Sequence, residues 1–275
     1  MHQHGIRIHQ YDPHPRLGRH QILDARSLPF IHRHHGGSLK PALWQPKTPV
    51  LDQQDLLAQG INVASLVPGG VPGTDALGSC TGNAGTAALS TVLTAVQCEA
   101  AGLSLTDPAA AEQFAIRLYA EATRQDEWLA QQWPPTDCGS SGLGVARALR
   151  ARGLVGSYVH AADADGIASL LQSGPLMLGM PWYNAWFEPP GSGAFVDDAP
   201  YWSTSGLAGG HEVCAVGLET VVQDTSGRVV PERTVLLIRN SWSRSWGDQG
   251  HFRMRLSTYT SQRRQIDVQQ LRLAS

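Results

Sequence analysis

The sequence lacks the features expected of a zinc protein, a membrane protein or a nucleic-acid-binding protein. Its four cysteines form no CxxC pair, so we expect no structural zinc site. It has no run of about 18 apolar residues, so we expect no segment that spans a membrane. The formal net charge is −2, which leaves no dominant basic character for binding nucleic acid or an acidic membrane. We therefore expect neither of these partners.

The N-terminus lacks the apolar stretch of a secretory signal peptide, since it is polar and rich in histidine. We expect a protein of the cytoplasm or one associated with a virus particle. Hydrophobic residues make up 42% of the chain and charged residues 16%, which is ordinary for a globular protein. A chain of 275 residues can bury a large core without the help of disulfides.

Residues 1–48 are predicted to form an irregular extension that lies over the folded body. Eight of the 11 histidines fall here, and Pro13, Pro15 and Pro29 interrupt any regular period. The segments MHQH and HRHH could ligate zinc or nickel, although a solvated, weakly basic arm is the simpler interpretation. The apolar residues expected to anchor the arm are Ile22, Leu23, Leu28, Phe30 and Ile31.

Residues 49–275 are predicted to form an α+β protein, with a helical lobe over about 49–155, a β-rich lobe over about 156–275 and a cleft between them. Helices are expected near 79–98, 108–124, 140–153 and 163–171, and strands near 176–180, 211–218, 235–240 and 251–256. Gly82 and Gly85 lower the helix propensity of the first segment, so tertiary packing must hold it.

Three segments contain candidate catalytic residues: LGSCTGNA (77–84), GGHEVCAVG (209–217) and RNSWSRSWGDQGHF (239–252). Cys80 lies at the predicted start of a helix, where the helix dipole favours a thiolate nucleophile. His211 opens a predicted strand after two glycines and would act as the base. Asn240 ends another strand, where its amide would orient the imidazole. Nucleophile, base and orienting group are thus all present in one chain.

These segments together resemble the papain family of cysteine peptidases, in its bacterial and phage-type branch. RNSWSRSWGDQGHF is the most specific of them, and Trp242 matches the tryptophan that shields the Asn–His hydrogen bond in that family. The resemblance covers roughly residues 49–256. It implies a papain-like two-lobe fold and hydrolysis of a peptide or protein substrate through Cys80, without a cofactor or metal.

The N-terminal extension also resembles the start of such bacterial and phage proteins, through LGRH and DARS. It does not resemble the helical inhibitory propeptide of eukaryotic relatives, so no zymogen is predicted.

The sequence departs from the family pattern at the glutamine that stabilises the oxyanion. The family places this glutamine six residues before the cysteine, where this chain has Thr74. The segment PVLDQ (49–53) resembles the same block displaced upstream, which makes Gln53 the first candidate, Gln59 the second and Gln54 the third. Two alternatives to a peptidase therefore stay open. One is an inactive papain-like scaffold in a phage particle or larger assembly, and the other is an amidase acting on cell-wall peptides.

The remaining cysteines and an aromatic cluster are interpreted structurally. Cys98, Cys138 and Cys214 are predicted to be buried or semi-buried thiols. The cluster is predicted to belong to the core or to the lobe interface, with a substrate platform as the alternative. Its members are Trp182, Tyr183, Trp186 and Phe187.

Overall fold

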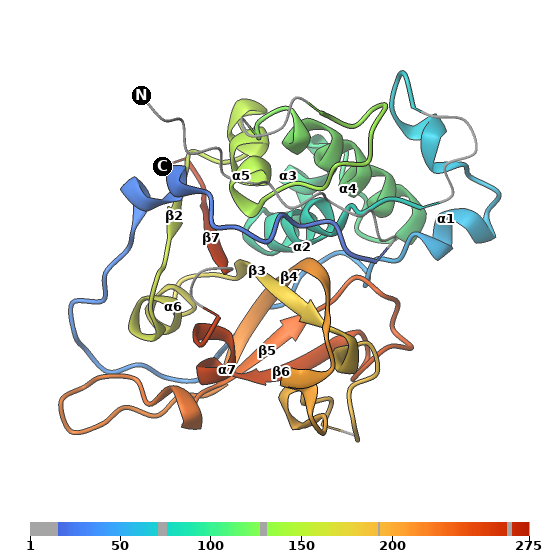
Figure 1. Cartoon of the computed structure of the whole chain (residues 1–275). Helices are drawn as coiled ribbons and strands as arrows, with labels where there is room; N and C mark the ends of the chain where they lie inside the picture. The colour runs from blue at the N-terminus through green and yellow to red at the C-terminus, as the bar shows by residue number, and fades with distance from the viewer. Residues whose placement is uncertain (1–15, 71–75, 127–130, 192, 263–265, 275) are drawn as a thin grey trace, which may run out of the picture.

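The computed structural model describes residues 16–70, 76–126, 131–191, 193–262 and 266–274 (Figure 1). The α-helices are α1 (Gln54–Ala58), α2 (Cys80–Val92), α3 (Ala95–Ala100), α4 (Pro108–Thr123), α5 (Gly142–Ala151), α6 (Ala164–Leu170) and α7 (Leu256–Thr260). The strands are β1 (Ala42–Leu43), β2 (Ser157–His160), β3 (Leu176–Tyr183), β4 (Leu207–Thr220), β5 (Val235–Arg239), β6 (His251–Arg255) and β7 (Asp267–Arg272). Short 3₁₀ helices include η1 (Ala25–Phe30) in the N-terminal arm.

The described strands form one antiparallel sheet in the order β2-β7-β3-β4-β5-β6, and β1 pairs with β4. In Figure 1, α2 to α5 lie together above and β3 to β6 lie below, with α2 facing β3 and β4. The prediction of an α+β fold is confirmed, because helices dominate the first half of the chain and an antiparallel sheet dominates the second. Within the described residues, no helix is long and apolar enough to cross a membrane.

The central helix α2 is held by close packing, as its two glycines predict. A Cβ at position 82 would lie 2.2 Å from the carbonyl oxygen of Ala115 in α4, and one at position 85 would lie 2.4 Å from the Val145 side chain in α5. The contact at position 82 is with backbone and excludes a side chain there, whereas a side chain at position 85 would require the Val145 side chain to move. Buried apolar residues of α2 belong to the same core cluster as the sheet residues Met177 and Cys214. The helix is therefore fixed by the neighbouring helices and by the sheet, and its N-terminus is fixed with it.

Most predicted helices are confirmed, and the first one is shorter than expected. The helix predicted to reach residue 98 ends at Val92, and α3 begins after Thr94. The cause is local, because the Thr94 hydroxyl accepts from the backbone of Gln97 while the Gln97 side chain accepts from the backbone of Thr94. This capping box starts a new helix and stops the old one.

Strands β2 and β7 were not predicted, although they pair with each other and β7 also pairs with β3. β7 is buried along most of its length, yet three of its residues are Asp267, Gln269 and Gln270. Gln270 donates to the carbonyl oxygens of Leu170 and Gly174, and Gln269 donates to the Ser27 hydroxyl. These glutamines are buried because their amides form hydrogen bonds with neighbouring groups. The strand therefore lacks the alternation of apolar and polar residues from which a strand is predicted.

From residue 16, where its description begins, the N-terminal arm lies over the body, but its anchors differ from the prediction. Ile22, Leu28, Phe30 and Ile31 are 37–45% exposed, and Leu23 is half-buried. The buried residues of the arm are instead Leu17 and three polar residues, Arg19, Asp24 and Ser27. Hydrogen bonds and ion pairs hold this segment more than apolar contact does, so the prediction from apolar residues was wrong. The segment MHQH lies outside the described residues.

Candidate active site

Cys80 is the first residue of α2, where the unsatisfied backbone N–H groups of a helix begin. Its sulfur lies close to β4, because the backbone amide of Glu212 is near enough to lower the pKa of the thiol. Glu212 directly follows His211, so the structure brings the nucleophile block and the histidine block together although they are far apart in the sequence. The helical part thus supplies the thiol, and the sheet supplies the imidazole.

The loop before Cys80 is held by side chains from two distant segments. Gln53 accepts from the backbone N–H of Leu77 at 2.8 Å and donates to the Leu77 carbonyl and the Ser79 hydroxyl, each at 2.7 Å. Asp137 accepts from the backbone N–H of Gly78 at 2.8 Å. These bonds fix the backbone that leads into the helix, and so fix the orientation of the thiol.

His211 and Asn240 are joined by a hydrogen bond of 2.8 Å between Nε2 and Oδ1. Asn240 Oδ1 also accepts from the backbone N–H of Ser241 at 2.8 Å. Because an oxygen that accepts both bonds must be the amide carbonyl, we assign the imidazole proton to Nε2 and the basic lone pair to Nδ1. Both side chains are buried, His211 fully and Asn240 to 3% exposure. The amide therefore fixes one tautomer of a ring that water does not reach.

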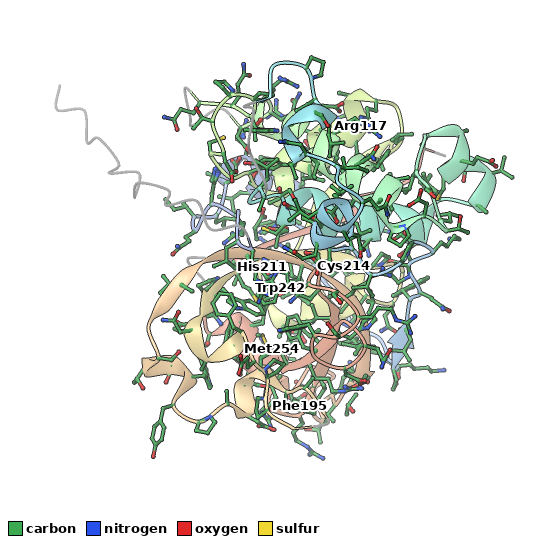
Figure 2. All side chains as sticks on the ribbon, turned by 90° about the vertical axis from the view of Figure 1, so that its right-hand side faces the viewer. Arg117, Phe195, His211, Cys214, Trp242 and Met254 are labelled. Atoms are coloured by element: carbon green, nitrogen blue, oxygen red, sulfur yellow. The ribbon has the colours of Figure 1, made fainter. Side chains whose placement is uncertain are left out.

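Two tryptophans enclose this pair. Trp242 stacks on His211 with ring centroids 4.7 Å apart and an interplanar angle of 23°, and Trp182 contacts the ring edge-on at 4.8 Å. Figure 2 shows His211 and Trp242 close together where the helical part meets the β-rich part, with Met254 and Phe195 further into the latter. Trp182 and Trp186 are fully buried, so the aromatic cluster belongs to the core, as predicted, and supplies no open platform for a substrate.

Residues 16–21 of the arm, here called the strap, occupy the cleft beside Cys80. The backbone N–H groups of Gly18 and Arg19 donate to the carbonyl of Gly210 on β4, at 3.2 and 3.1 Å. On the helical side, Ser140 donates its N–H to the Gly18 carbonyl at 2.8 Å and accepts from the His20 N–H at 2.9 Å. The strap is therefore bonded to both parts of the protein, and in Figure 1 it is the darkest blue segment between helices and sheet.

Close contact between backbones keeps the strap over the thiol. The amide of Gly18 lies near enough to the Cys80 sulfur to lower the pKa of the thiol, and a Cβ on Gly18 would lie 1.6 Å from the Gly78 carbonyl oxygen. Only a glycine fits this position. The indole of Trp242 donates to the Arg16 carbonyl at 3.2 Å and extends the contact past the imidazole.

The thiol of Cys80 is only 4% exposed, and this burial governs its ionisation. Burial raises the pKa of Cys80 to about 12, against the smaller opposing effects of the amides of Glu212 and Gly18 and of the Arg19 charge. The sequence predicted the opposite direction, from the helix N-terminus and a nearby imidazolium. The prediction was wrong for the strap-covered state, because desolvation outweighs these effects where the strap excludes water.

The three glutamine candidates lie at different places. Gln53 contacts the loop before Cys80 and lines a small pocket of about 100 Å³ together with Cys80, Asp52, Glu112 and Trp242. Gln54 is exposed at the edge of the same pocket. Gln59 is exposed at the C-terminal end of α1 and does not line the pocket. The geometry thus favours the displaced glutamine that the sequence ranked first.

The other candidates have structural positions. Cys98, Cys138 and Cys214 are buried free thiols, as predicted. Of the HRHH histidines, His32 lies within hydrogen-bond distance of the Ser169 hydroxyl, and no group of three potential metal ligands occurs in the described part of the chain. Among the residues that sequence reasoning missed, Gly18, Arg19 and Glu212 approach the thiol. The segments LGRH and GGHEVCAVG contain these residues, but nothing in either segment shows that it lies beside the thiol, because Gly18 and Arg19 reach it through the path of the strap and Glu212 through the packing of β4 against α2.

Comparison with known proteins agrees with this geometry. Residues 129–270, more than half of the chain, match the family described as papain family cysteine protease. No curated protein sequence matches the chain. The crystal structure of xylellain, a cysteine protease from Xylella fastidiosa, is similar at 18% identity and a TM-score of 0.60, over 95% of this chain and 97% of that one.

Two further solved structures have a weaker similarity to the chain. Bromelain from Ananas comosus has 13% identity and a TM-score of 0.44, over 92% of this chain and 99% of that one. Procathepsin L 3 from the larval midgut of Tenebrio molitor has 12% identity and a TM-score of 0.49, over 94% of this chain and 76% of that one. The likeness to xylellain confirms the papain-like fold, and the match over residues 129–270 places the chain in the papain family of cysteine proteases.

Proposed function

We propose that this chain is a cysteine peptidase that cleaves peptide bonds through an acyl-enzyme on Cys80. The observation that carries the proposal is the hydrogen bond between His211 Nε2 and Asn240 Oδ1. His211 lies on β4, and the next residue, Glu212, is close enough to Cys80 for its backbone amide to affect the pKa of the thiol. A thiol at a helix start, a tautomer-fixed imidazole and an orienting amide are the groups that acyl transfer to a thiol requires. Membership of the papain family supports the same chemistry.

The proposed reaction starts when the strap leaves the cleft and a substrate carbonyl takes its place. His211 Nδ1 accepts the thiol proton, and the sulfur attacks the carbonyl carbon of the scissile bond. The imidazolium passes this proton to the leaving amine as the C–N bond breaks, which leaves a thioester on Cys80. Water attacks the thioester with His211 as base, and the acid product and the free thiol are released.

The oxyanion of each tetrahedral intermediate would be stabilised by the backbone N–H of Cys80 and by the side-chain amide of Gln53. Gln53 donates to the Leu77 carbonyl and the Ser79 hydroxyl in the strap-covered state. Its amide would exchange one of these partners for the oxyanion. Loss of such a donor typically costs about 10²–10³ in kcat.

A covalent probe tests the proposal. The full chain, opened at the strap by Gly18→Val, is incubated under reducing conditions with an epoxide or vinyl sulfone, with Cys80→Ala as the control. We expect one adduct, located on Cys80, and loss of peptidase activity in proportion to labelling. An opened chain that neither labels at Cys80 nor cleaves a peptide library would overturn the proposal.

One observation favours the alternative of an inactive papain-like scaffold. Cys80 is buried beneath the strap, and a covered cleft is what a structural or binding protein would retain. The same probe separates the two functions, because a scaffold would stay unreactive after the strap is released. Digestion of peptidoglycan beside the peptide library would distinguish an amidase of cell-wall peptides from a general peptidase.

A further inference from the structure

A buried acidic pocket lies beside the reacting groups and holds the side chain of Arg19. Arg19 is 1% exposed, and its Nε lies 3.5 Å from Glu212 Oε2. The second carboxylate of the pocket is Asp267 on β7, also 1% exposed. Glu212 connects the pocket to the proposed catalytic groups, because it directly follows His211 on β4 while its carboxylate pairs with Arg19.

The walls of the pocket leave room for a long side chain. A Cβ at position 179 would lie 2.1 Å from Arg19 Nε, and a Cβ at position 142 would lie 2.5 Å from Glu212 Oε1 and 3.2 Å from Asp267 Oδ2. Two glycines thus create the space in which the guanidinium and the carboxylates lie. Behind them, Tyr259 donates to the backbone carbonyls of Gly179 and Asp267 and so fixes the pocket wall.

The pocket contains more acceptors than its own residues satisfy. Within the described residues, no hydrogen bond reaches either carboxylate oxygen of Glu212, Oδ2 of Asp267 or Oε1 of Gln269, and all four atoms are buried. Buried acceptors that receive no hydrogen bond are costly unless a donor enters, and the ion pair between Arg19 and Glu212 at 3.5 Å is too long to supply one. A guanidinium has five N–H donors and a permanent positive charge, so it suits such a set better than any apolar side chain.

We propose that this acidic pocket is the specificity pocket of the enzyme, that it selects an arginine side chain next to the scissile bond, and that Arg19 fills it as a built-in competitor. The proposal rests on the peptidase function proposed above and names its substrate class. The strap pairs with Ser140 through a parallel bridge and lies on the Gly210 carbonyl, so it uses the backbone positions that an extended substrate would need.

The expected substrates are peptides or proteins with arginine beside the cleaved bond. A neutral side chain of the same shape would bring no charge into the pocket, and would leave the Glu212 carboxylate buried without the guanidinium that Arg19 now supplies. The preference of the enzyme among substrates should therefore depend on the charge of this side chain more than on its size. Glutamine-lined or apolar pockets would not show this dependence.

The experiment uses the full chain carrying Gly18→Val, which removes the strap and leaves every pocket residue in place. Fluorogenic peptides are scanned with arginine or its neutral isostere citrulline at each position near the scissile bond. We expect arginine to exceed citrulline in kcat/KM by about 100-fold at one position. Adding Asp267→Asn should reduce this ratio to below about tenfold, whereas Asp197→Asn, a buried carboxylate outside the pocket, should leave it unchanged. Equal cleavage of the two peptides would overturn the proposal.

A binding measurement separates the pocket from the catalysis. A labelled peptide with the sequence of residues 16–24 is titrated into the Gly18→Val chain that also carries Cys80→Ser, and its citrulline-19 counterpart is titrated beside it. Tighter binding of the arginine peptide, lost with Asp267→Asn, supports the pocket even where no substrate is cleaved. Cleavage without any preference for arginine, together with equal binding of both peptides, would leave the peptidase function intact and refute the pocket. If Gly18→Val does not fold, Arg19→Ala empties the same pocket and repeats both measurements.

Discussion

The strap should protect Cys80 from alkylation, and Gly18→Val should remove that protection. The valine Cβ would lie 1.6 Å from the Gly78 carbonyl oxygen, so the strap could not remain against the loop before α2. Gly18 does not have a backbone conformation that excludes valine, since its φ is not positive. The substitution therefore acts through the contact with the cleft and not through strain in the backbone of the strap.

The size of the effect follows from the ionisation of the thiol. Burial raises the pKa of Cys80 from its ordinary 9.0 to about 12. At pH 8 this lowers the thiolate fraction about a thousandfold, and the thiolate is the form that reacts with iodoacetamide. We expect Cys80 of the native chain to react about 10³ times more slowly than a free cysteine, and the Gly18→Val chain to react at least about 100 times faster than the native one.

Peptide mass spectrometry after timed alkylation measures the rates at each cysteine. Ala25→Val, an exposed change in the same arm, is the matched control and should leave the rate at Cys80 unchanged. Cys214 is an internal control, because burial raises its pKa to about 12 as well and the strap does not cover it. Rapid alkylation of Cys80 in the native chain, or an unchanged rate after Gly18→Val, would refute the reasoning.

Three further predictions concern the site and the core. In the strap-opened chain, Asn240→Ala should lower kcat by about 10- to 100-fold with little change in KM, because His211 loses its tautomer-fixing partner; steady-state kinetics check this. Gln53→Ala should lower kcat by about 10²–10³, whereas the exposed Gln59→Ala should have no effect; equal effects would contradict the assignment of Gln53. Burial raises the pKa of Glu112 from 4.5 to about 8, so the folded state retains a proton that the unfolded state releases first. The free energy of unfolding should therefore fall between pH 4.5 and 8, by at most about 1.4 kcal/mol per pH unit, and Glu112→Gln should flatten this slope in denaturant titrations, while the exposed Glu232→Gln should not.

The elements that the sequence predicted are those whose signals are local. Asp107 caps α4 through the amides of Ala109 and Ala110, and Pro108 follows at the first helical position, so the helix start could be read directly. β4 is a long, largely buried strand that begins near the Gly-Gly-His segment, and its central part was also predicted directly from the apolar residues of the sequence. The blocks around Cys80, His211 and Asn240 were recognised because their motifs are contiguous. Their catalytic roles stay predictions.

The parts that were missed depend on contacts between segments far apart in the chain. The arm is held by buried Arg19, Asp24 and Ser27, so a search for apolar anchors selected exposed residues instead. The raised pKa of Cys80 depends on the strap that covers it, and the cysteine block contains no sign of that cover. Likewise, Glu212 and Asp267 form one pocket only because β7 lies beside β3, a pairing that the buried amides of β7 concealed.

The arm is anchored to the body at η1 and again at β1. If the strap inhibits the enzyme, this anchoring determines how the inhibition responds to dilution of the protein. Only a few residues after the strap, Arg26 donates to the Gln125 carbonyl and pairs with Asp24, and further along β1 pairs with β4. A segment tethered this closely returns to its cleft by a unimolecular step, at an effective concentration in the millimolar range. Diluting the protein would therefore not activate it. A substrate would have to compete at comparable concentration, or a second event would have to detach η1 and lengthen the tether.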